Sequence, residues 1–598
     1  MKRGRTWMVA GALALAAGLP APAVGQASWL PGEVVAWRAS PDGRVAEVRV
    51  RGVVVARLAG PGAWARASAA VQALRRPLPP PEAVSVRARR GSAALLVDGR
   101  VVLGASARDA QRAGTDPATL AGQWAARLRE ALAIPPLTVA PSSVVLSPDG
   151  TATLRVGTVV PGPLSATPAD RRVVGADVAA DAITLRGRAL GATTVRVRLG
   201  PYQTAVAVSV RPPAGRIPAE AEVVVTGTPA PVPVVHEAVR RWVEAAVVRT
   251  AGAVVRWSPI PVDAPLEAGA AVTVHLPVSV RSPYAGPVDR RVAITIRNAP
   301  LSLRDPDVLL VSNRPETIDG NGLLFEDTLQ PRRGARLLYH HMNGTDQARI
   351  LSITLTNAGP GLARVHYLSG HAGPSPDPLQ VGALATGRFL TALGGGQGYL
   401  VEVPAQRATT FTAYALPPRA LVSGIMQFQV IDGGPVGLRV AVRLPWLLDR
   451  TVTADLGPYA FPHPRGTFPG TVVDLVREVR VDRPADVADL GVMAELKDVR
   501  TGEALVGDYG VLYRIRLRLH NPTAAEVPVA LVANAAGGPA RGLFVIDGAM
   551  TDVGLLAPTV DRVVATFVLA AGETRAVTVV TMPVAGSFYP VRLSVRPR

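Results

Sequence analysis

The second half of the chain contains one pattern twice. "ILSITLTNAGPGLARVHYL" and "RIRLRLHNPTAAEVPVALV" each show an alternating strand, an asparagine at its end, a short turn and a return strand. "LVEVPAQRATTFTAYAL" and "FVLAAGETRAVTVVTMP" follow later and again share a plan, a second hairpin. Asn357 and Asn521 lie 164 residues apart, and Gln406 and Glu573 lie 167 apart. Nearly equal offsets at two landmarks predict two copies of one fold.

The composition favours many short strands. The 598 residues include 58 glycines and 55 prolines, which punctuate a sequence rich in valine and threonine. Because 48% of the residues are apolar and only 18% are charged, a disordered chain is excluded. The length is too great for one core, so several domains are expected.

Residues 28–137 are predicted to form an α+β domain. Asp116 and Pro117 are typical of the start of a helix. Four apolar residues then recur at every fourth position and predict a buried stripe: Leu120, Trp124, Leu128 and Leu132. "VDGRVVLGASARDAQRAGTDPATLAGQWAARLREAL" is similar to a small extracytoplasmic domain of bacterial envelope proteins. That resemblance implies export but no activity.

Residues 138–212 are predicted to be a small β domain. "DGTATLRV", "ITLRGRALGATTVRV" and a final "VAVSV" alternate between apolar and polar residues. The segment resembles the β-sandwich domain at the N-terminus of pilus-assembly and secretin-type proteins, and the bacterial immunoglobulin-like domain of surface proteins. The resemblance implies a role in assembly or spacing and carries no catalytic residues.

The remaining domains complete the fold class. Residues 213–300 mix strands with one helix, "VVHEAVRRWVEAAVV", whose inward residues are expected to include Val239 and Trp242, and are predicted to form a small α+β connector. The two repeats are placed at 301–445 and 446–598 and resemble extracellular immunoglobulin-like sandwich domains. The predicted fold is therefore mostly β: a multidomain chain of Ig-like β-sandwiches with an N-terminal α+β domain and a small α+β connector.

The N-terminus predicts export. Residues 1–27 have a basic start, an apolar stretch and small residues before a cleavage position, as in a secretory signal peptide. No later stretch is apolar for long enough to predict a membrane span. Without cysteine there is no disulfide framework. The mature protein is expected to be periplasmic or extracellular.

The net charge of +19 raises the question of nucleic-acid binding. Only Lys2 and Lys497 are lysines, and the arginines are scattered along the chain rather than clustered. Since specific binding calls for a basic patch, no specific nucleic acid is predicted as a partner.

A histidine cluster is the first candidate site. His340 and His341 run into Asn343-Gly344, a strong signal for a hairpin turn. Adjacent side chains on a strand point to opposite faces, so the two cannot easily share one metal ion. His341 could still join His366 and His371 at a metal site if the return strand is its neighbour. Structural or surface histidines are the alternative.

A basic strand is the second candidate site. In "VLYRIRLRLHN" three arginines and a histidine alternate with apolar residues and share one face: Arg514, Arg516, Arg518 and His520. This face could bind a polymer that carries carboxylates or phosphates. Alternatively, it is a solvated face whose charges prevent strand pairing between molecules.

The sequence contains no signature of a catalytic nucleophile and predicts neither an enzyme nor a cofactor. The predicted function is that of an exported cell-envelope protein that works by binding, spacing or assembly. Its expected partners are envelope proteins, with pilus or secretion-system proteins as the most concrete version. The alternative is a surface protein that binds an anionic or carbohydrate cell-wall polymer through its β-sandwiches. A hydrolase would need convergent carboxylates or histidines between domains.

Overall fold

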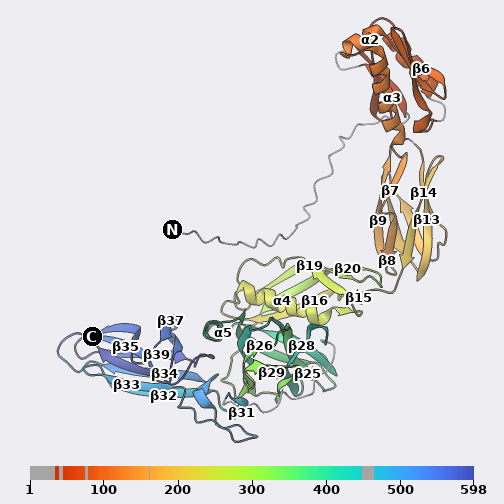
Figure 1. Ribbon diagram of the computed structural model, residues 1–598. Coiled ribbons are helices and arrows are strands. Elements are labelled where there is room, and N and C mark those ends of the chain that lie inside the picture. The colour runs from red at the N-terminus through yellow and green to blue at the C-terminus, as the bar shows by residue number, and fades with distance from the viewer. Residues whose placement is uncertain (1–33, 40–44, 75–77, 161, 448–462) are drawn as a thin grey trace. The chain divides into compact units, whose positions relative to one another are not determined.

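The computed structural model describes residues 34–39, 45–74, 78–160, 162–447 and 463–598 (Figure 1). Strands dominate its regular structure, as the sequence predicts. The chain divides into two compact units: one up to residue 214 together with 281–288, and a second formed by the rest of the chain from residue 215 onward. The predicted signal peptide lies outside the described residues.

The N-terminal part of the first unit combines two antiparallel three-stranded sheets with three helices. The strands are β1 (Val35–Ala39), β2 (Val45–Val50), β3 (Val53–Ala59), β4 (Val84–Arg89), β5 (Ser92–Val97) and β6 (Arg100–Ala105). The helices are α1 (Ala63–Leu74), α2 (Ala107–Arg112) and α3 (Pro117–Ala133). Asp116 accepts hydrogen bonds from two backbone amides at the start of α3, and the predicted apolar stripe is buried. The predicted start and buried face of α3 are therefore confirmed.

Two four-stranded sheets form the second part of the first unit. One contains β8 (Ser143–Leu146), β10 (Leu164–Pro168), β13 (Gly191–Leu199) and β14 (Tyr202–Val210). The other contains β7 (Leu137–Ala140), β9 (Thr151–Thr158), β11 (Val174–Val178) and β12 (Ala182–Gly187). Alternate residues of both sheets meet in one core of valine, leucine and isoleucine, which makes a β-sandwich.

An 11-stranded sheet organises the second unit. From one edge its strands are β18 (Val254–Trp257), β19 (Ala271–Arg281), β20 (Val288–Asn298), β16 (Glu220–Thr226), β27 (Gly398–Val403), β26 (Ala363–Ser375), β29 (Leu421–Asp432), β24 (Gly334–Asn343), β21 (Val308–Ser312) and β31 (Arg465–Pro469), with β22 (Thr317–Ile318) beside β24. The predicted boundary near residue 300 does not separate two sheets, because β16 pairs with both β20 and β27. The expected connector is one end of this large sheet.

A smaller sheet and a helix cover one face of the large sheet. The smaller sheet contains β23 (Gly322–Leu329), β30 (Val436–Arg443), β25 (Arg349–Asn357) and β28 (Arg407–Leu416). Helix α4 (Val232–Ala246) packs on β16 and β27, and its Arg241 reaches Thr412 of β28. The predicted inward set of this helix was partly wrong, because Val239 is buried but Trp242 is only half-buried.

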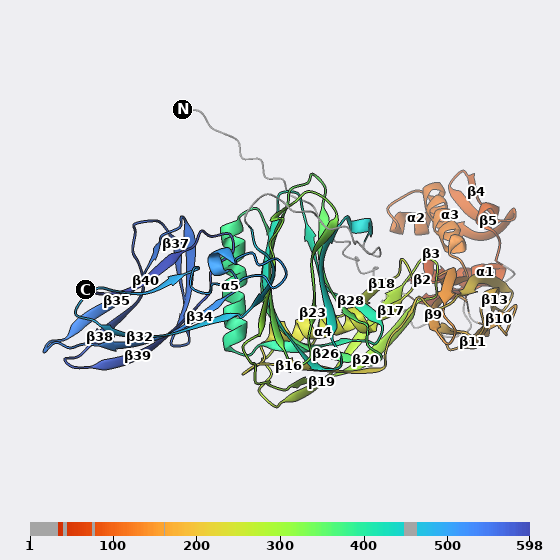
Figure 2. The same cartoon turned by 90° about the horizontal axis from the view of Figure 1, so that it is seen from below.

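Helix α5 (Pro378–Gly394) lies between the large sheet and the C-terminal sandwich (Figure 2). It packs on β26 and β29 on one side and on β36 of the C-terminal sandwich on the other. Gly370 and Gly382 allow this packing, because a Cβ at Gly370 would collide with the backbone of Phe389 and one at Gly382 with the carbonyl oxygen of Ala585. A single hydrophobic core continues from the large sheet through Phe389 into the C-terminal sandwich.

The C-terminal sandwich begins at residue 472 rather than at the predicted 446, since β31 belongs to the large sheet. One of its sheets contains β32 (Val472–Arg480), β34 (Leu512–His520), β39 (Thr574–Thr581), β36 (Ala540–Ile546) and β37 (Ala549–Leu556). The other contains β33 (Ala485–Leu490), β40 (Val591–Pro597), β35 (Val527–Ala535) and β38 (Arg562–Leu569).

The repeated asparagines occupy equivalent positions in the two copies. The Asn357 amide donates to the oxygens of Gly361 and Val403, at 2.8 and 2.9 Å. The Asn521 amide donates to the oxygens of Ala525 and Leu569, at 2.8 and 3.1 Å. Each side-chain oxygen also accepts the amide two residues on. Both turns therefore have one geometry, held by a buried side chain.

These turns are not hairpins, which corrects the expected pairing. The strands before and after each asparagine lie in different sheets, as do the strands around Gln406 and Glu573. Asn343 ends β24 in the same way, donating to the oxygens of Gln347 and Leu416. The Asn343-Gly344 hairpin was therefore wrong: β24 and β25 lie in facing sheets, because the asparagine side chain satisfies the backbone of a chain that crosses between layers.

Candidate functional site

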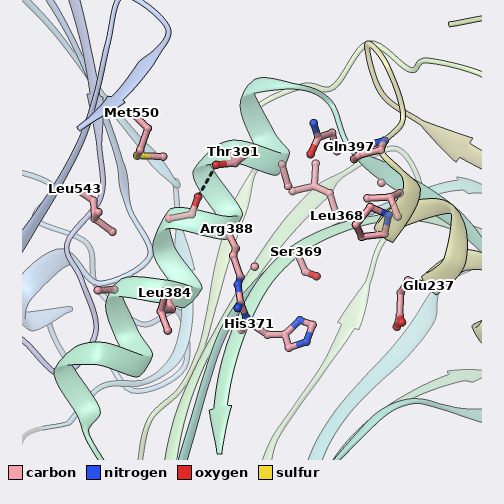
Figure 3. A pocket seen from close by; sticks show the side chains of 18 of the residues that line it. Glu237, Leu368, Ser369, His371, Leu384, Arg388, Thr391, Gln397, Leu543 and Met550 are labelled. Atoms are coloured by element: carbon pink, nitrogen blue, oxygen red, sulfur yellow. Dashed lines mark hydrogen bonds between the residues drawn. The ribbon is translucent and has the colours of Figure 1, made fainter. Parts of the chain in front are cut away.

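A groove of about 920 Å³ lies between α4, α5 and β26, and we call it the α4–α5 groove (Figure 3). Its walls come from the first turns of α4, one face of α5, the start of β27 and two strands of the C-terminal sandwich, β36 and β37. Side chains from distant parts of the chain thus meet in one space.

The floor of the groove is an open edge of β26. Pairing between β26 and β27 ends at Tyr367 and Tyr399, whereas β26 continues to Ser375. Beyond Tyr367, β29 is the only described strand beside β26. Alternate residues of a strand direct their backbone groups to the same side. The amide and carbonyl groups of Ser369 and His371 therefore face the groove, as those of Tyr367 face β27.

Helix α5 forms the apolar wall. Its two other faces are buried against the large sheet and the C-terminal sandwich. The face toward the groove carries the apolar side chains of Ala383, Leu384 and Ala392 and the polar ones of Gln380, Arg388 and Thr391. Leu384 is 46% exposed, a high value for a leucine on a helix that is otherwise packed on two sides. Leu543 and Met550 of the sandwich extend this apolar surface.

The α4 wall is charged but internally neutralised. Glu237 pairs with Arg240 and Arg241 at 2.6 and 2.7 Å, and Arg240 also pairs with Glu244 at 2.6 Å. Burial alone would raise the pKa of Glu237, but the two guanidinium groups outweigh burial and lower it. Burial disfavours the charged form of Arg241, yet Glu237 raises its pKa. These groups stay ionised and paired.

A group of aromatic side chains lies beneath the groove. Tyr367 contacts Tyr399 edge-on, with ring centroids 5.2 Å apart, and His371 lies 5.5 Å from Tyr414. Burial raises the pKa of both Tyr367 and Tyr399. Burial also lowers the pKa of His371, although Glu237 opposes this. At neutral pH, His371 and the two tyrosines are therefore uncharged and can donate or accept hydrogen bonds.

The arrangement is suited to binding. Glu237 is paired with two arginines, and His371 is uncharged at neutral pH. Across the described ranges, no group of three histidine or acidic side chains converges in a way that could hold a metal ion. The groove combines an apolar wall with a row of backbone donors and acceptors.

The predicted histidine site does not form. His366 and His371 both belong to β26, whereas His341 is on β24, with β29 in between. His341 contacts Ser312 and the oxygen of Pro315, at 2.9 and 2.8 Å. His366 contacts Thr226 at 3.1 Å.

His340, His341 and His366 are buried structural residues. Burial lowers the pKa of His341 and His366 to about 4 and that of His340 to about 3. His340 lies on β24 beside His341, and both its ring nitrogens lack a hydrogen-bond partner. The alternative of structural histidines fits this geometry, because neutral rings on β24 and β26, two strands separated by β29, cannot share one metal ion.

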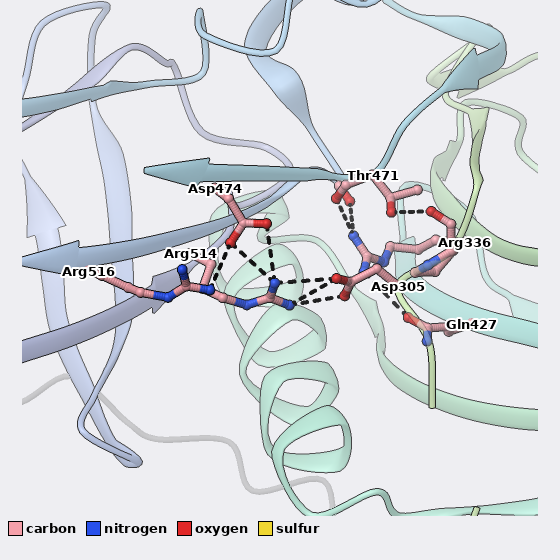
Figure 4. Close-up of polar contacts among 9 residues, drawn as sticks. Asp305, Arg336, Gln427, Thr471, Asp474, Arg514 and Arg516 are labelled. Carbon is pink, nitrogen blue, oxygen red and sulfur yellow. Dashed lines mark hydrogen bonds and ion pairs between the residues drawn. The ribbon is translucent and has the colours of Figure 1, made fainter. Parts of the chain in front are cut away.

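The basic strand β34 carries its predicted residues on one face, and Figure 4 shows two of them, Arg514 and Arg516. Strand β32 runs parallel beside it and places Asp474 opposite Arg514 and Glu478 opposite Arg518. Arg514 is 3.2 Å from Asp474, Arg518 is 2.8 Å from Glu478, and Arg516 is 3.8 Å from Asp474.

Further contacts complete this charge balance. Arg514 also pairs with Asp305 at 3.0 Å, and His520 contacts Thr574 at 3.0 Å. Carboxylates of the same chain therefore already pair with the arginines that the sequence suggested as a binding site for an anionic polymer. Asp305 lies between Arg514 and the buried Arg336 (Figure 4).

Arg336 joins the two sandwiches of the second unit. It is fully buried and donates to the oxygens of Thr471 and Gly510, at 2.8 and 3.0 Å. Its guanidinium lies 5.4 Å from the ring of Phe389 on α5. Burial lowers the pKa of Arg336 to about 9, which leaves it charged at neutral pH.

The groove was missed at the sequence level because α5 was missed. Asp377 and Pro378 stand before it as Asp116 and Pro117 stand before α3, and the Asp377 side chain caps the helix by accepting from the Gln380 amide. That signal was present. The meeting of α4, α5 and β37 has no local signal, because it depends on the order of strands in the large sheet.

Within the described residues, no helix has the length and hydropathy of a membrane span. No family model matches the chain, and no curated protein matches it. Among solved structures, domains 4 and 5 of the S-layer protein SbsC are 21% identical over 12% of this chain and half (50%) of that chain, with a TM-score of 0.12. Domains 5-6 of SbsC are 14% identical over 27% of this chain and 96% of that chain, with a TM-score of 0.13. A tandem of titin immunoglobulin domains is 9% identical over 27% of this chain and 97% of that chain, with a TM-score of 0.12. TM-scores this low carry no argument about this chain.

Proposed function

We propose that the chain is an exported, non-enzymatic binding protein of the bacterial cell envelope. It holds its partner in the α4–α5 groove, and its successive β domains act as spacers. The observation that carries the proposal is the groove itself, which is large, lined on one side by apolar side chains, and contains charges that are already paired within the chain. A site of this kind gains free energy by burying a partner's surface.

The more specific version is a role in pilus or secretion-system assembly. Its support is the sequence resemblance at 138–212, a segment that folds as a separate two-sheet sandwich. A two-sheet sandwich suits spacing, whereas the groove of the second unit suits binding.

The alternative of a polymer-binding surface has less support. The arginines of β34 face Asp474, Glu478 and Asp305, so a polymer would have to compete with carboxylates of the same chain. Exposed ion pairs of this type are individually weak, about 0–1 kcal/mol, but they remove the net positive charge that would attract an anion.

A site-directed photocrosslinker tests the proposal. Benzoylphenylalanine replaces Leu384 in the groove or, as a matched control, Leu190 in the first unit, which is 57% exposed. Each full-length chain is produced in its native cells, the cells are fractionated, and the adducts are identified. We expect the chain outside the cytoplasm and an envelope-protein adduct from position 384 that position 190 does not give.

The identity of the adduct separates the versions of the proposal. Pilus or secretion components would support the specific version, and other envelope proteins only the general one. A cytoplasmic chain, or identical adducts at the two positions, would contradict the proposal.

A further inference from the structure

We infer that the occupant of the α4–α5 groove is an extended polypeptide segment, which adds to the large sheet as a strand along the free edge of β26. This inference rests on the proposed function, since it names the chemistry of the partner at the same site. The occupant would continue the position of β27 in the sheet.

The backbone of β26 specifies this chemistry. Ser369 and His371 present amide and carbonyl groups to the groove at the spacing of a strand, and β29 pairs with the opposite side of β26. Another extended main chain complements such a row of alternating donors and acceptors. A purely apolar ligand would bury these groups without hydrogen bonds, at a cost of about 1–3 kcal/mol for each group.

Strand β27 is prevented from covering the edge itself. The chain leaves α5 and enters β27 through Gly395 and Gly396. Thr226 of β16 donates to the oxygen of Gly396 at 2.7 Å, and the backbone amide of Thr228 donates to the oxygen of Gly395 at 3.2 Å. These bonds fix the start of β27, so the edge beyond Tyr367 stays available.

The two faces of the groove predict the side chains of the guest strand. Residues of a strand alternate between faces, so one set would contact α5 and the other set the tyrosines. The α5 side offers Ala383, Leu384 and Leu543, which favour aliphatic residues. The opposite side offers Ser369 and the ring of His371, which favour small or polar residues.

The charges of the groove disfavour a basic guest. Glu237 is neutralised by two arginines, and Arg541 of β36 pairs with Asp552 of β37 at 3.0 Å. A charged guest would find no unpaired partner among these five groups, and Arg388, whose guanidinium contacts a carbonyl oxygen, would repel a basic residue. An aliphatic and polar segment, alternating and without basic residues, fits best.

Arg388 covers the edge while the groove is empty. Its guanidinium donates to the carbonyl oxygen of His371 at 2.6 Å. Charged side chains over an exposed edge prevent unwanted strand pairing. The guest must displace this bond, so Arg388→Ala is expected to bind the guest severalfold more tightly than the natural chain does.

The test selects peptides for the groove. Random dodecapeptides displayed on phage are enriched on the full chain and depleted on the Leu384→Lys variant. The best sequences are then synthesised in two forms: unmodified, and N-methylated at alternate residues, which keeps the side chains but removes strand hydrogen bonds. Binding is measured by fluorescence anisotropy.

We expect an enriched alternating peptide whose affinity falls about tenfold or more after N-methylation in one of the two alternate registers. Leu384→Lys should cause a similar loss, because it places a charge in the apolar wall, whereas the control Leu190→Lys should leave the affinity unchanged. A Leu384→Met variant, which keeps the apolar wall, should also bind, so that a loss from misfolding can be recognised.

Two outcomes would overturn the inference. One is that no peptide is enriched on the natural chain over the Leu384→Lys variant. The other is that N-methylation in either register leaves the affinity unchanged, which would indicate recognition of side chains only. A photocrosslink at position 384 to an envelope component, together with either outcome, would leave the proposed function standing and remove only the strand-addition mode.

Discussion

The guanidinium of Arg388 on α5 lies 2.6 Å from the carbonyl oxygen of His371 on β26. This contact joins a helix and a strand edge that local sequence patterns do not connect. It also marks the place where the large sheet stops being paired, because β27 ends its contact with β26 four residues earlier, at Tyr367. The candidate site of this chain therefore depends on the order of strands in the large sheet, and Arg388 covers the unpaired edge.

The position of α5 depends on Gly382. A Cβ at this residue would collide with the oxygen of Ala585 in the C-terminal sandwich. We expect Gly382→Ala to lower the free energy of unfolding by about 2–4 kcal/mol, because backbone cannot move aside cheaply. Gly394, near the end of the same helix, has open space around it, so Gly394→Ala should be neutral or stabilise by up to about 1 kcal/mol. Calorimetry of both variants checks this, and equal effects would contradict the close packing of α5 on the C-terminal sandwich.

The asparagine turns make a second prediction. Asn521→Ala should cost about 2–4 kcal/mol, because it leaves buried carbonyl groups without a donor. Asn534→Ala is the matched control, since this side chain makes one exposed contact with Asp561 at 3.4 Å. Thermal unfolding of the C-terminal sandwich should separate the two variants clearly. Similar melting temperatures would show that the turn does not depend on the buried amide.

Acid should destabilise the second unit through its buried histidines. Their folded pKa values, about 3 for His340 and about 4 for His341 and His366, lie below the usual 6.5. As pH falls below 6.5, the unfolded chain takes up protons first. Each histidine then lowers the free energy of unfolding by about 1.4 kcal/mol per pH unit, until its folded pKa is reached.

Replacing His340 tests this pH dependence. Both ring nitrogens of His340 lack a partner, so His340→Leu should be neutral or stabilising at pH 7 and should reduce the acid loss. His275, whose side chain is exposed, is the control position for the same substitution. Urea denaturation between pH 4.5 and 7 measures both, and an unchanged slope in His340→Leu would contradict the prediction.

Because the arginines of β34 are paired with carboxylates, we expect them to contribute no more to polyanion binding than other exposed arginines do. The Arg516→Ser/Arg518→Ser double variant should elute from heparin at the same salt concentration as Arg290→Ser/Arg291→Ser, a control that removes two exposed arginines elsewhere. Equal shifts indicate a loss of general charge only. A clearly larger shift for the β34 variant would restore the polymer-binding alternative.

Local chemistry in the sequence predicted local structure well. Asp116 with Pro117 located the start of α3. The repeated strand–asparagine–turn pattern at Asn357 and Asn521 identified two turns of one geometry. In each case the signal and the interaction lie within a few residues, or recur in a second copy. The mostly β composition follows from the same short-range patterns.

Pairing between distant strands could not be predicted in this way. An asparagine followed by a short turn has the same sequence in a hairpin and in a crossing between sheets, so Asn343 was assigned to a hairpin. The predicted histidine metal site was wrong for the same reason, because β29 separates β24 from β26. The carboxylates opposite Arg514 and Arg518 come from a parallel neighbour some 40 residues earlier, which alternation alone does not identify.

Amide hydrogen exchange at the edge of β26 tests the central claim most directly. The claim is that β26 is unpaired on its groove side beyond Tyr367. In the free protein, the account predicts fast exchange at Ser369 and strong protection at Gly370, whose amide faces β29. A selected peptide should then slow exchange at Ser369 and His371 and leave Gly370 unchanged. Equal, strong protection of Ser369 and Gly370 in the free protein would show that the edge is already covered and would contradict the account.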